Sequence, residues 1–134
     1  MINDLMSKLM QKRIPQIEHY MNHPIEVQDE LLKSLLKTAK NTIWGNYYDY
    51  KSIRNWQDYN ERVPVSDYES LLPFFIRLCC GEDNVLWPSQ IKWFSKSSGT
   101  TSTKSKFIPI STECLNDCHY KGGKDMLALY CNNK

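Results

Sequence analysis

Residues 97–106 combine hydroxyl side chains, a glycine and lysines, which are the residue types that a phosphate-binding loop needs. Gly99 lets the backbone turn and come close to a ligand, because glycine has no Cβ. Hydroxyls and backbone N–H groups donate hydrogen bonds to phosphate oxygens, and ammonium groups offset the phosphate charge. The hydroxyls belong to Ser97, Ser98, Thr100, Thr101 and Ser102, and the ammonium groups to Lys104, Lys106 and the directly preceding Lys96. Residues 97–106 are therefore a candidate phosphate loop, with a solvated linker as the alternative because hydroxyl-rich loops are common.

The spacing within this loop excludes a Walker loop. That pattern requires Gly-Lys-Ser/Thr after a four-residue spacer, whereas Gly99 is followed five residues on by Lys104, with no second glycine between them. A Walker loop also leads from a strand into a helix. Here the flanking segments "IKWFS" and "KFIPI" have the composition of two short strands. The sequence therefore predicts a strand-loop-strand over residues 91–110.

Cysteine and histidine residues offer little further chemistry. Cys114 and Cys118 lie four residues apart, with His119 beside them. Structural zinc usually takes four ligands, and no second pair is well placed, so we predict no metal site and expect buried or half-buried thiols. Five cysteines are an odd number, and the N-terminal segment "MINDLMSKLMQKR" lacks the pattern of a secretory signal. Both features predict reduced thiols and a cytoplasmic location.

The elements around the loop are predicted to be mostly helical, over residues 1–45, 67–78 and 112–130. Pro24 suits the first position of a helix, and Gly45 is predicted to end the first helical region. Ser66 and Glu69 have the spacing of a capping box before the second helix. Apolar periodicity predicts the buried positions Leu31, Leu32, Leu35, Leu36 and Ala39 in the first region, and Leu115, Met126, Leu127 and Tyr130 in the last helix.

Composition limits the class of protein. Hydrophobic residues make up 41% of the 134 residues and aromatics 12%, which argues against disorder and is consistent with one domain. The tryptophans are expected to anchor the core. The net charge is only +2, and no block of like charge suggests binding to nucleic acid or to a membrane surface. No apolar run approaches the ~20 residues that span a bilayer. A small-molecule or protein partner is therefore expected.

The segment "SSGTTSTKSKFIP" resembles the phosphate-binding signature of adenylate-forming enzymes, a Ser/Thr-Ser-Gly-Thr-Thr core followed by a lysine. The flanking segments "NTIWGNYYDY", "VPVSDYESLLPFF", "NVLWPSQIKWFSKSSGTT" and "KFIPIS" are similar to the acyl-acid amido synthetases, the family of the auxin- and jasmonate-conjugating plant enzymes, and in particular to its bacterial branch. The resemblance covers nearly the whole chain.

This resemblance implies an α/β fold, in which residues 1–134 are the N-terminal part of the large adenylation domain and a β-hairpin carries the phosphate loop. It implies a ligase that uses ATP and Mg²⁺ to activate a small carboxylic acid as an acyl-adenylate, which an amine or amino acid then converts to an amide. Ser97, Ser98, Gly99, Thr100 and Thr101 would hold the ATP phosphates, with Lys106 as the lysine of the signature. No catalytic side chain is assigned.

The sequence departs from the family pattern in the loop and in length. The family often has Gly at positions that Ser102 or Thr103 occupy here, and Pro where Ser105 stands. Family members are also several times longer, so the chain is expected to be an N-terminal fragment that is inactive alone. Unpaired strand edges would invite association. The alternatives are a non-catalytic helical interaction module or gene remnant and, least favoured, a different nucleotide-binding protein.

Overall fold

The computed structural model describes residue 8, residues 10–98 and residues 105–133. The chain divides into two compact units. Residues 29–112 form one, named here the hairpin unit, and residues 1–28 with 113–134 form the other, the paired-helix unit. No helix in the described ranges is long and apolar enough to cross a membrane.

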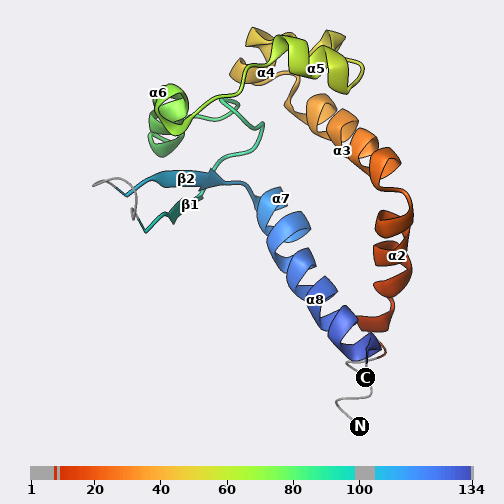
Figure 1. Ribbon diagram of the computed structural model, residues 1–134. Helices are drawn as coiled ribbons and strands as arrows, with labels where there is room; N and C mark the ends of the chain where they lie inside the picture. The colour runs from red at the N-terminus through yellow and green to blue at the C-terminus, as the bar shows by residue number, and fades with distance from the viewer. Residues whose placement is uncertain (1–7, 9, 99–104, 134) are drawn as a thin grey trace. The chain divides into compact units, whose positions relative to one another are not determined.

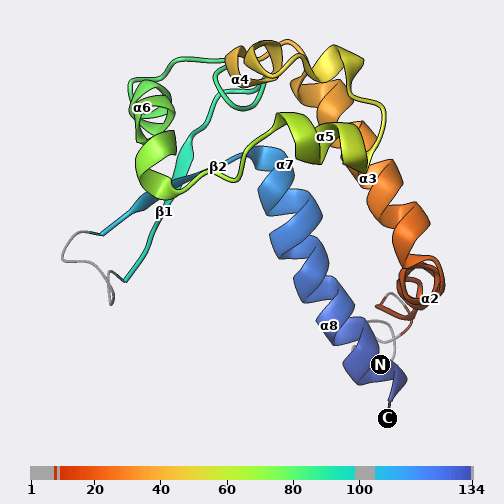
Figure 2. The same ribbon diagram turned by 45° about the horizontal axis from the view of Figure 1, so that its top comes forward.

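Helices dominate both units (Figures 1 and 2). The hairpin unit holds most of α3 (Pro24–Ala39), then α4 (Ile43–Tyr47), a 3-10 turn (Tyr50–Ser52), α5 (Trp56–Arg62), α6 (Tyr68–Cys79), β1 (Trp93–Lys96) and β2 (Phe107–Ile110). The paired-helix unit holds α2 (Ile14–Asn22), the start of α3, and a helical run. This run is made of α7 (Thr112–Cys114) without its first residue, a π-helical segment (Leu115–Tyr120) and α8 (Lys121–Asn132). The mostly helical fold with a β-hairpin is as predicted, whereas α5 lies between the predicted helical ranges 1–45 and 67–78.

Gly45 is not a helix end, contrary to the prediction. The buried Thr42 is the N-cap of α4, and its hydroxyl accepts a hydrogen bond from the Gly45 N–H at 2.9 Å. The same hydroxyl donates to the Ala39 carbonyl at 2.8 Å. A Cβ on Gly45 would lie 2.1 Å from that carbonyl oxygen. Glycine is therefore required here because the backbones of α3 and α4 approach closely.

Two apolar clusters form the core of the hairpin unit. One contains Phe75 and Leu78 of α6 with Val85 and Ile91. The other contains Leu36, Ile53 and Val63. Leu31 and Leu35, predicted to be buried, are exposed, because the face of α3 that packs inward is centred on Leu36 and Ala39. Trp44 and Trp87 pack against the clusters as expected, whereas Trp56 and Trp93 are exposed.

Both ends of α6 are closed by local hydrogen bonds. At its start, Asp67 is the N-cap and forms a capping box with Ser70, one residue later than the predicted pair of Ser66 and Glu69. At its end, the Gly81 N–H donates to the Leu78 carbonyl at 3.0 Å and the Glu82 N–H to the Arg77 carbonyl at 3.1 Å. This is a Schellman motif, and Gly81 has the positive φ of 83° that it requires.

Strands β1 and β2 form an antiparallel hairpin in which Trp93 pairs with Ile110 and Lys96 with Phe107. Because side chains alternate across a strand, Phe94 lies on the opposite face from Trp93. Phe94 packs against the α6 cluster, whereas Trp93 and Ile108 are exposed. The hairpin therefore packs on the α6 cluster through Phe94, while Trp93 and Ile108 on the opposite face are exposed.

In the paired-helix unit, α2 lies beside α8 (Figure 1). Arg13 Nε donates to Asp125 Oδ1 at 2.7 Å, and the Lys121 ammonium donates to the Tyr20 hydroxyl at 2.8 Å. The burial predicted for Met126, Leu127 and Tyr130 is wrong, since these side chains are exposed and Ala128 is buried instead. The reason is that α8 turns the face with Lys121, Asp125 and Ala128 toward α2. The prediction for residues 1–7 and 9 falls outside the described residues.

Candidate functional site

The described chain includes the two ends of the candidate phosphate loop. Ser97 and Ser98 follow β1, and Lys106 precedes β2. Ser97 and Lys106 are half-buried, and Ser98 is exposed. Gly99, Thr100 and Thr101, together with Ser102, Thr103 and Lys104, lie outside the described residues. The structure therefore shows how the loop begins and ends.

Reciprocal hydrogen bonds close the neck of the loop, which is the pair Ser97 and Lys106. The Ser97 N–H donates to the Lys106 carbonyl at 3.0 Å. The Lys106 N–H donates to the Ser97 hydroxyl oxygen at 3.1 Å. Ser97 Oγ therefore already accepts one hydrogen bond, which leaves its O–H proton available to a ligand. The neck extends the hairpin pairing by one residue and brings both ends of the loop together.

Tyr68, the first residue of α6, contacts the second half of the neck. Its hydroxyl oxygen accepts a hydrogen bond from the Phe107 N–H at 3.1 Å. The Lys106 ammonium lies 5.0 Å from the centroid of the Tyr68 ring, within the range of a cation–π contact. The ring of Tyr68 in turn lies 5.4 Å from that of Phe75 in the core. The neck is thus attached to the start of α6.

The charged groups near the neck include the Lys106 ammonium and the Asp67 carboxylate. Hydrogen bonds from the Ser70 hydroxyl and the Ser70 N–H lower the pKa of Asp67, with a smaller contribution from the charge of Lys106. The carboxylate is therefore ionised at neutral pH and engaged in capping α6. Hydroxyls, backbone N–H groups and an ammonium suit the binding of an anion. Asp67 Oδ1 accepts the capping hydrogen bond from the Ser70 N–H at 2.8 Å, which engages this oxygen in closing the start of α6.

Sequence reasoning did not identify Tyr68 or Asp67 as neighbours of the loop. The segment "SDYES" carries a capping signal, which locates the start of a helix. Nothing in it indicates a contact with Phe107, which is 39 positions away. The juxtaposition depends on how α6 packs on the hairpin.

The described residues contain no group of three or more His, Cys, Asp or Glu side chains that could hold a metal ion. No disulfide joins any of the five cysteines, all of which lie in the described part of the chain. Contrary to expectation, Cys79, Cys80, Cys114 and Cys118 are exposed, and Cys131 is half-buried. Desolvation, followed by the neighbouring Cys118 thiol, raises the pKa of Cys114. A thiol that resists ionisation is a weaker metal ligand.

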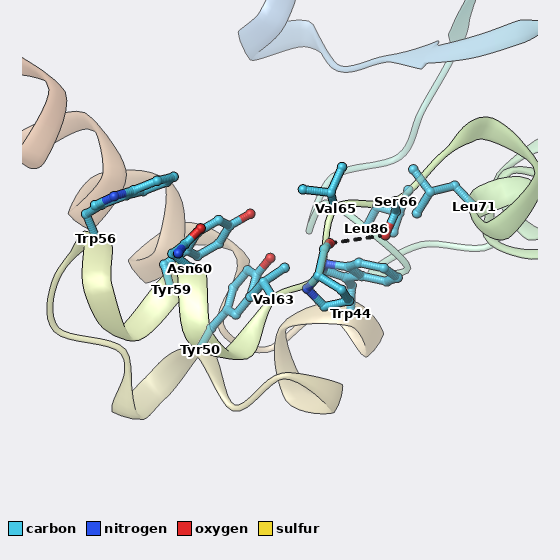
Figure 3. A pocket seen from close by; sticks show the side chains of 11 residues that line it. Trp44, Tyr50, Trp56, Tyr59, Asn60, Val63, Val65, Ser66, Leu71 and Leu86 are labelled. Atoms are coloured by element: carbon cyan, nitrogen blue, oxygen red, sulfur yellow. Dashed lines mark hydrogen bonds between the residues drawn. The ribbon is translucent and has the colours of Figure 1, made fainter.

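An aromatic pocket of about 460 Å³ also lies in the hairpin unit (Figure 3). Trp56, Tyr59 and Asn60 of α5 line one end, and Trp44 with Leu86 lines the other. None of the described side chains that line it carries a charge at neutral pH. Burial, and then the neighbouring Tyr59, raise the pKa of Tyr50 in its wall, so that hydroxyl stays neutral. The pocket suits an uncharged apolar group and offers no cation for a phosphate.

Comparison with known proteins identifies relatives of this chain. Residues 13–134 match the GH3 family N-terminal domain. The chain is 29% identical over 106 residues to the indole-3-acetic acid-amido synthetase GH3.2 of Arabidopsis thaliana, a match that covers 78% of this chain and 19% of that protein. It is 27% identical over 106 residues to the jasmonoyl–L-amino acid synthetase JAR6 of Nicotiana attenuata, covering 78% of this chain and 18% of that one.

These matches span less than a fifth of the length of the two plant relatives. The family match, in contrast, includes nearly all of this chain, from α2 through the hairpin to α8. The chain therefore belongs to the GH3 family, and residues 13–134 correspond to its N-terminal domain.

Proposed function

We propose that this chain supplies the ATP-phosphate loop of an acyl-acid amido synthetase, as the N-terminal part of its adenylation domain. The observation that carries the proposal is the closed neck of the loop, where the half-buried Ser97 and Lys106 exchange hydrogen bonds at 3.0 and 3.1 Å. The neck holds a stretch of hydroxyls and backbone N–H groups between two paired strands. Membership in a family that includes ATP-dependent conjugating enzymes supports the same assignment.

In the proposed reaction, a carboxylate oxygen of the substrate acid attacks the α-phosphorus of ATP. The bond to the bridging oxygen breaks, and pyrophosphate leaves. An amine or amino acid then attacks the acyl carbon, AMP leaves with the bonding electron pair, and the nitrogen loses a proton. Ser97, Ser98, Gly99, Thr100 and Thr101 would donate hydrogen bonds to the phosphates, and Lys106 would supply positive charge.

Mg²⁺, when bound to ATP, would help to neutralise the β- and γ-phosphates. The described residues near the neck do not fit a protein-held Mg²⁺, because magnesium sites use carboxylates and Asp67 is engaged in its capping box. We therefore assign no metal ligand among the described residues and derive no step through the ion.

The acid and the amine are proposed only as classes. The two plant relatives are named for indole-3-acetic acid and for jasmonoyl amino acids. For this chain we propose a small carboxylic acid and an amine or amino-acid acceptor, without choosing among them. A bacterial source and a cytoplasmic location also remain predictions from the sequence, the latter because reduced cysteines suit that compartment.

Acid-dependent exchange of labelled pyrophosphate into ATP tests the proposed function. The experiment uses the protein encoded by the reading frame that contains this sequence, with a panel of carboxylic acids. Ser98→Ala combined with Thr101→Ala is expected to reduce exchange at least about tenfold, because donors to the phosphates are lost. The matched control is Ser34→Ala with Thr38→Ala, two exposed hydroxyls on α3, which should leave exchange unchanged. Equal exchange in both double mutants would contradict the loop assignment.

The 134 residues alone are proposed to be inactive, with weak ATP binding. Calorimetry of the isolated chain with ATP checks this, and a micromolar dissociation constant would contradict it. The second candidate function, a non-catalytic helical interaction module, is favoured by the exposed apolar side chains of Met126, Leu127 and Tyr130 on α8. The gene sequence after Lys134 distinguishes the two, since several hundred further in-frame residues support the synthetase.

A further inference from the structure

We propose that Tyr68 is a positioning residue, which holds the Lys106 ammonium and the first amide of β2 in place for the phosphate loop. This inference rests on the proposed function, in which the loop binds phosphates. It assigns a role to a residue of α6 that lies outside the loop and outside its signature.

Tyr68 contacts Lys106 of the neck and the next residue, Phe107, with two different parts of its side chain. The hydroxyl oxygen accepts the Phe107 N–H at 3.1 Å, and the ring face lies under the Lys106 ammonium at 5.0 Å. Because Lys106 directs its own N–H and carbonyl toward Ser97, the next N–H along the strand points away from β1. Tyr68 therefore satisfies a donor at the open edge of β2 and fixes the adjacent lysine at the same time.

Tyr68 is itself held on both sides. It directly follows Asp67, whose capping box with Ser70 fixes the start of α6. Its ring lies 5.4 Å from the ring of Phe75, which is only 8% exposed. The position of the Tyr68 ring is thus set by the core of the hairpin unit. The contact with this ring therefore fixes the position of the Lys106 ammonium.

An aromatic face is a suitable support for a lysine that must bind phosphate. A flexible lysine loses rotamer freedom when it binds, and a lysine that is already held loses less. A carboxylate in the same place would neutralise the ammonium, whereas the ring attracts it without cancelling its charge. Asp67, the carboxylate that directly precedes Tyr68, accepts a hydrogen bond from Ser70 at Oδ1. Lys106 therefore keeps its charge available for an anion.

The first test measures the lysine directly and does not depend on catalysis. Lysines of the protein encoded by the full reading frame are ¹³C-methylated, and the Lys106 NMR signal is assigned with Lys106→Arg. An ammonium over the ring is expected to give an upfield-shifted signal that Tyr68→Leu abolishes and Tyr68→Phe retains. A Lys106 signal at the position of an exposed lysine in the wild-type protein would overturn the proposal, even if Tyr68→Leu fails to fold.

The second test measures anion binding, with inorganic tripolyphosphate as the probe. Tyr68→Leu is expected to weaken binding about two- to fivefold, the effect of one cation–π contact, and Tyr68→Phe less. Tyr47→Leu, at an exposed tyrosine of α4, is the matched control. In a Lys106→Gln background, Tyr68→Leu should cause a smaller further loss, because only the hydrogen bond from the Phe107 N–H remains to be removed. An equal further loss would show a merely structural role and overturn the proposal.

The outcomes separate this inference from the proposed function. Absence of pyrophosphate exchange with every acid would contradict the synthetase, while the NMR shift and the tripolyphosphate series would still decide the role of Tyr68. Conversely, an active enzyme whose KM for ATP is unaffected by Tyr68→Leu would overturn the positioning role and leave the synthetase intact. A raised KM with an unchanged kcat is the expected result.

Discussion

Different kinds of interaction stabilise the hairpin unit and the paired-helix unit internally. The hairpin unit has two apolar clusters, and residues such as Leu78 and Val85 are almost fully removed from solvent. In the paired-helix unit, Ala128 is the buried apolar side chain among the described residues. Its two helices are joined instead by the polar contacts of Arg13 with Asp125 and of Lys121 with Tyr20.

The unit that carries the loop has an apolar core, whereas the paired-helix unit leaves apolar side chains exposed. Burial of a large apolar side chain contributes more to stability than a partly exposed ion pair does. The hairpin unit therefore provides a stable support for Ser97 and Lys106, the neck of the candidate loop. The paired-helix unit leaves apolar side chains such as Met126 and Tyr130 in solvent. Four variants test this contrast.

Leu78→Ala in the hairpin unit is expected to cause the largest decrease in the free energy of unfolding. Leu78 is 2% exposed in the α6 cluster, and truncation of such a side chain costs about 2–5 kcal/mol through lost burial and a cavity. Urea unfolding monitored by tryptophan fluorescence measures the change. Ile76→Ala, at a 55% exposed position of the same helix, should cost less than about 1 kcal/mol. Similar losses in both variants would contradict the described core.

Gly45→Ala is expected to lower the free energy of unfolding by a smaller amount, because the new Cβ would clash with the Ala39 carbonyl oxygen. Such overpacking costs about 1–3 kcal/mol. The control in the paired-helix unit is Gly123→Ala, where a Cβ meets nothing within 4 Å. Alanine should stabilise that helix by about 0.5–1 kcal/mol. Thermal unfolding of both variants checks the opposite signs, and a stabilising Gly45→Ala would show that α3 and α4 are not so close.

Asp125→Asn should lower the free energy of local opening of the paired-helix unit by about 1–2 kcal/mol. It weakens a charged hydrogen bond between two side chains that are each about one-fifth exposed. Amide hydrogen exchange in α2 and α8 measures this local opening. Asp29→Asn removes the exposed pair with Lys33 on α3 and should cost less than about 0.5 kcal/mol. If the exchange of α2 and α8 does not change in Asp125→Asn, the ion pair does not join them.

The smallest effect concerns acid stability through Asp67. Its pKa in the folded state lies below the ordinary value because Ser70 donates to it. Its stabilising contribution is therefore present above the unfolded-state pKa of about 3.9 and is lost as the pH falls through the lower, folded-state pKa. Asp67→Asn keeps a capping side chain and should show a shallower acid-induced loss of stability. Urea unfolding between pH 5 and about pH 3 compares the slopes, and equal slopes would contradict the expectation.

Local signals in the sequence were reliable where one short segment decided the outcome. The hairpin on either side of the loop follows from two apolar runs flanking a hydroxyl-rich stretch. The stop of α6 at Gly81 follows from the freedom of glycine at positive φ. The capping box of α6 was misplaced by one residue, because Ser66, Asp67 and Ser70 all offer capping side chains.

Which apolar residues are buried could not be predicted for the paired helices. The helical spacing of apolar residues alone predicted that Met126, Leu127 and Tyr130 of α8 are buried, whereas α2 covers the face of Ala128. The choice depends on the polar partners Arg13 and Tyr20, which come from the opposite end of the chain. Gly45 was misread for a related reason, since the carbonyl that forbids its side chain belongs to the preceding helix.

The sequence by itself determined the candidate loop, its placement between two strands and its family resemblance, because these depend on residue types at fixed short spacings. Only the tertiary structure decided that Tyr68 meets Lys106 and Phe107, and that Phe75 supports Tyr68. Contacts between residues far apart in sequence depend on how α6 packs against the hairpin. No local pattern encodes that packing, since it arises from the burial of apolar surface shared by several elements.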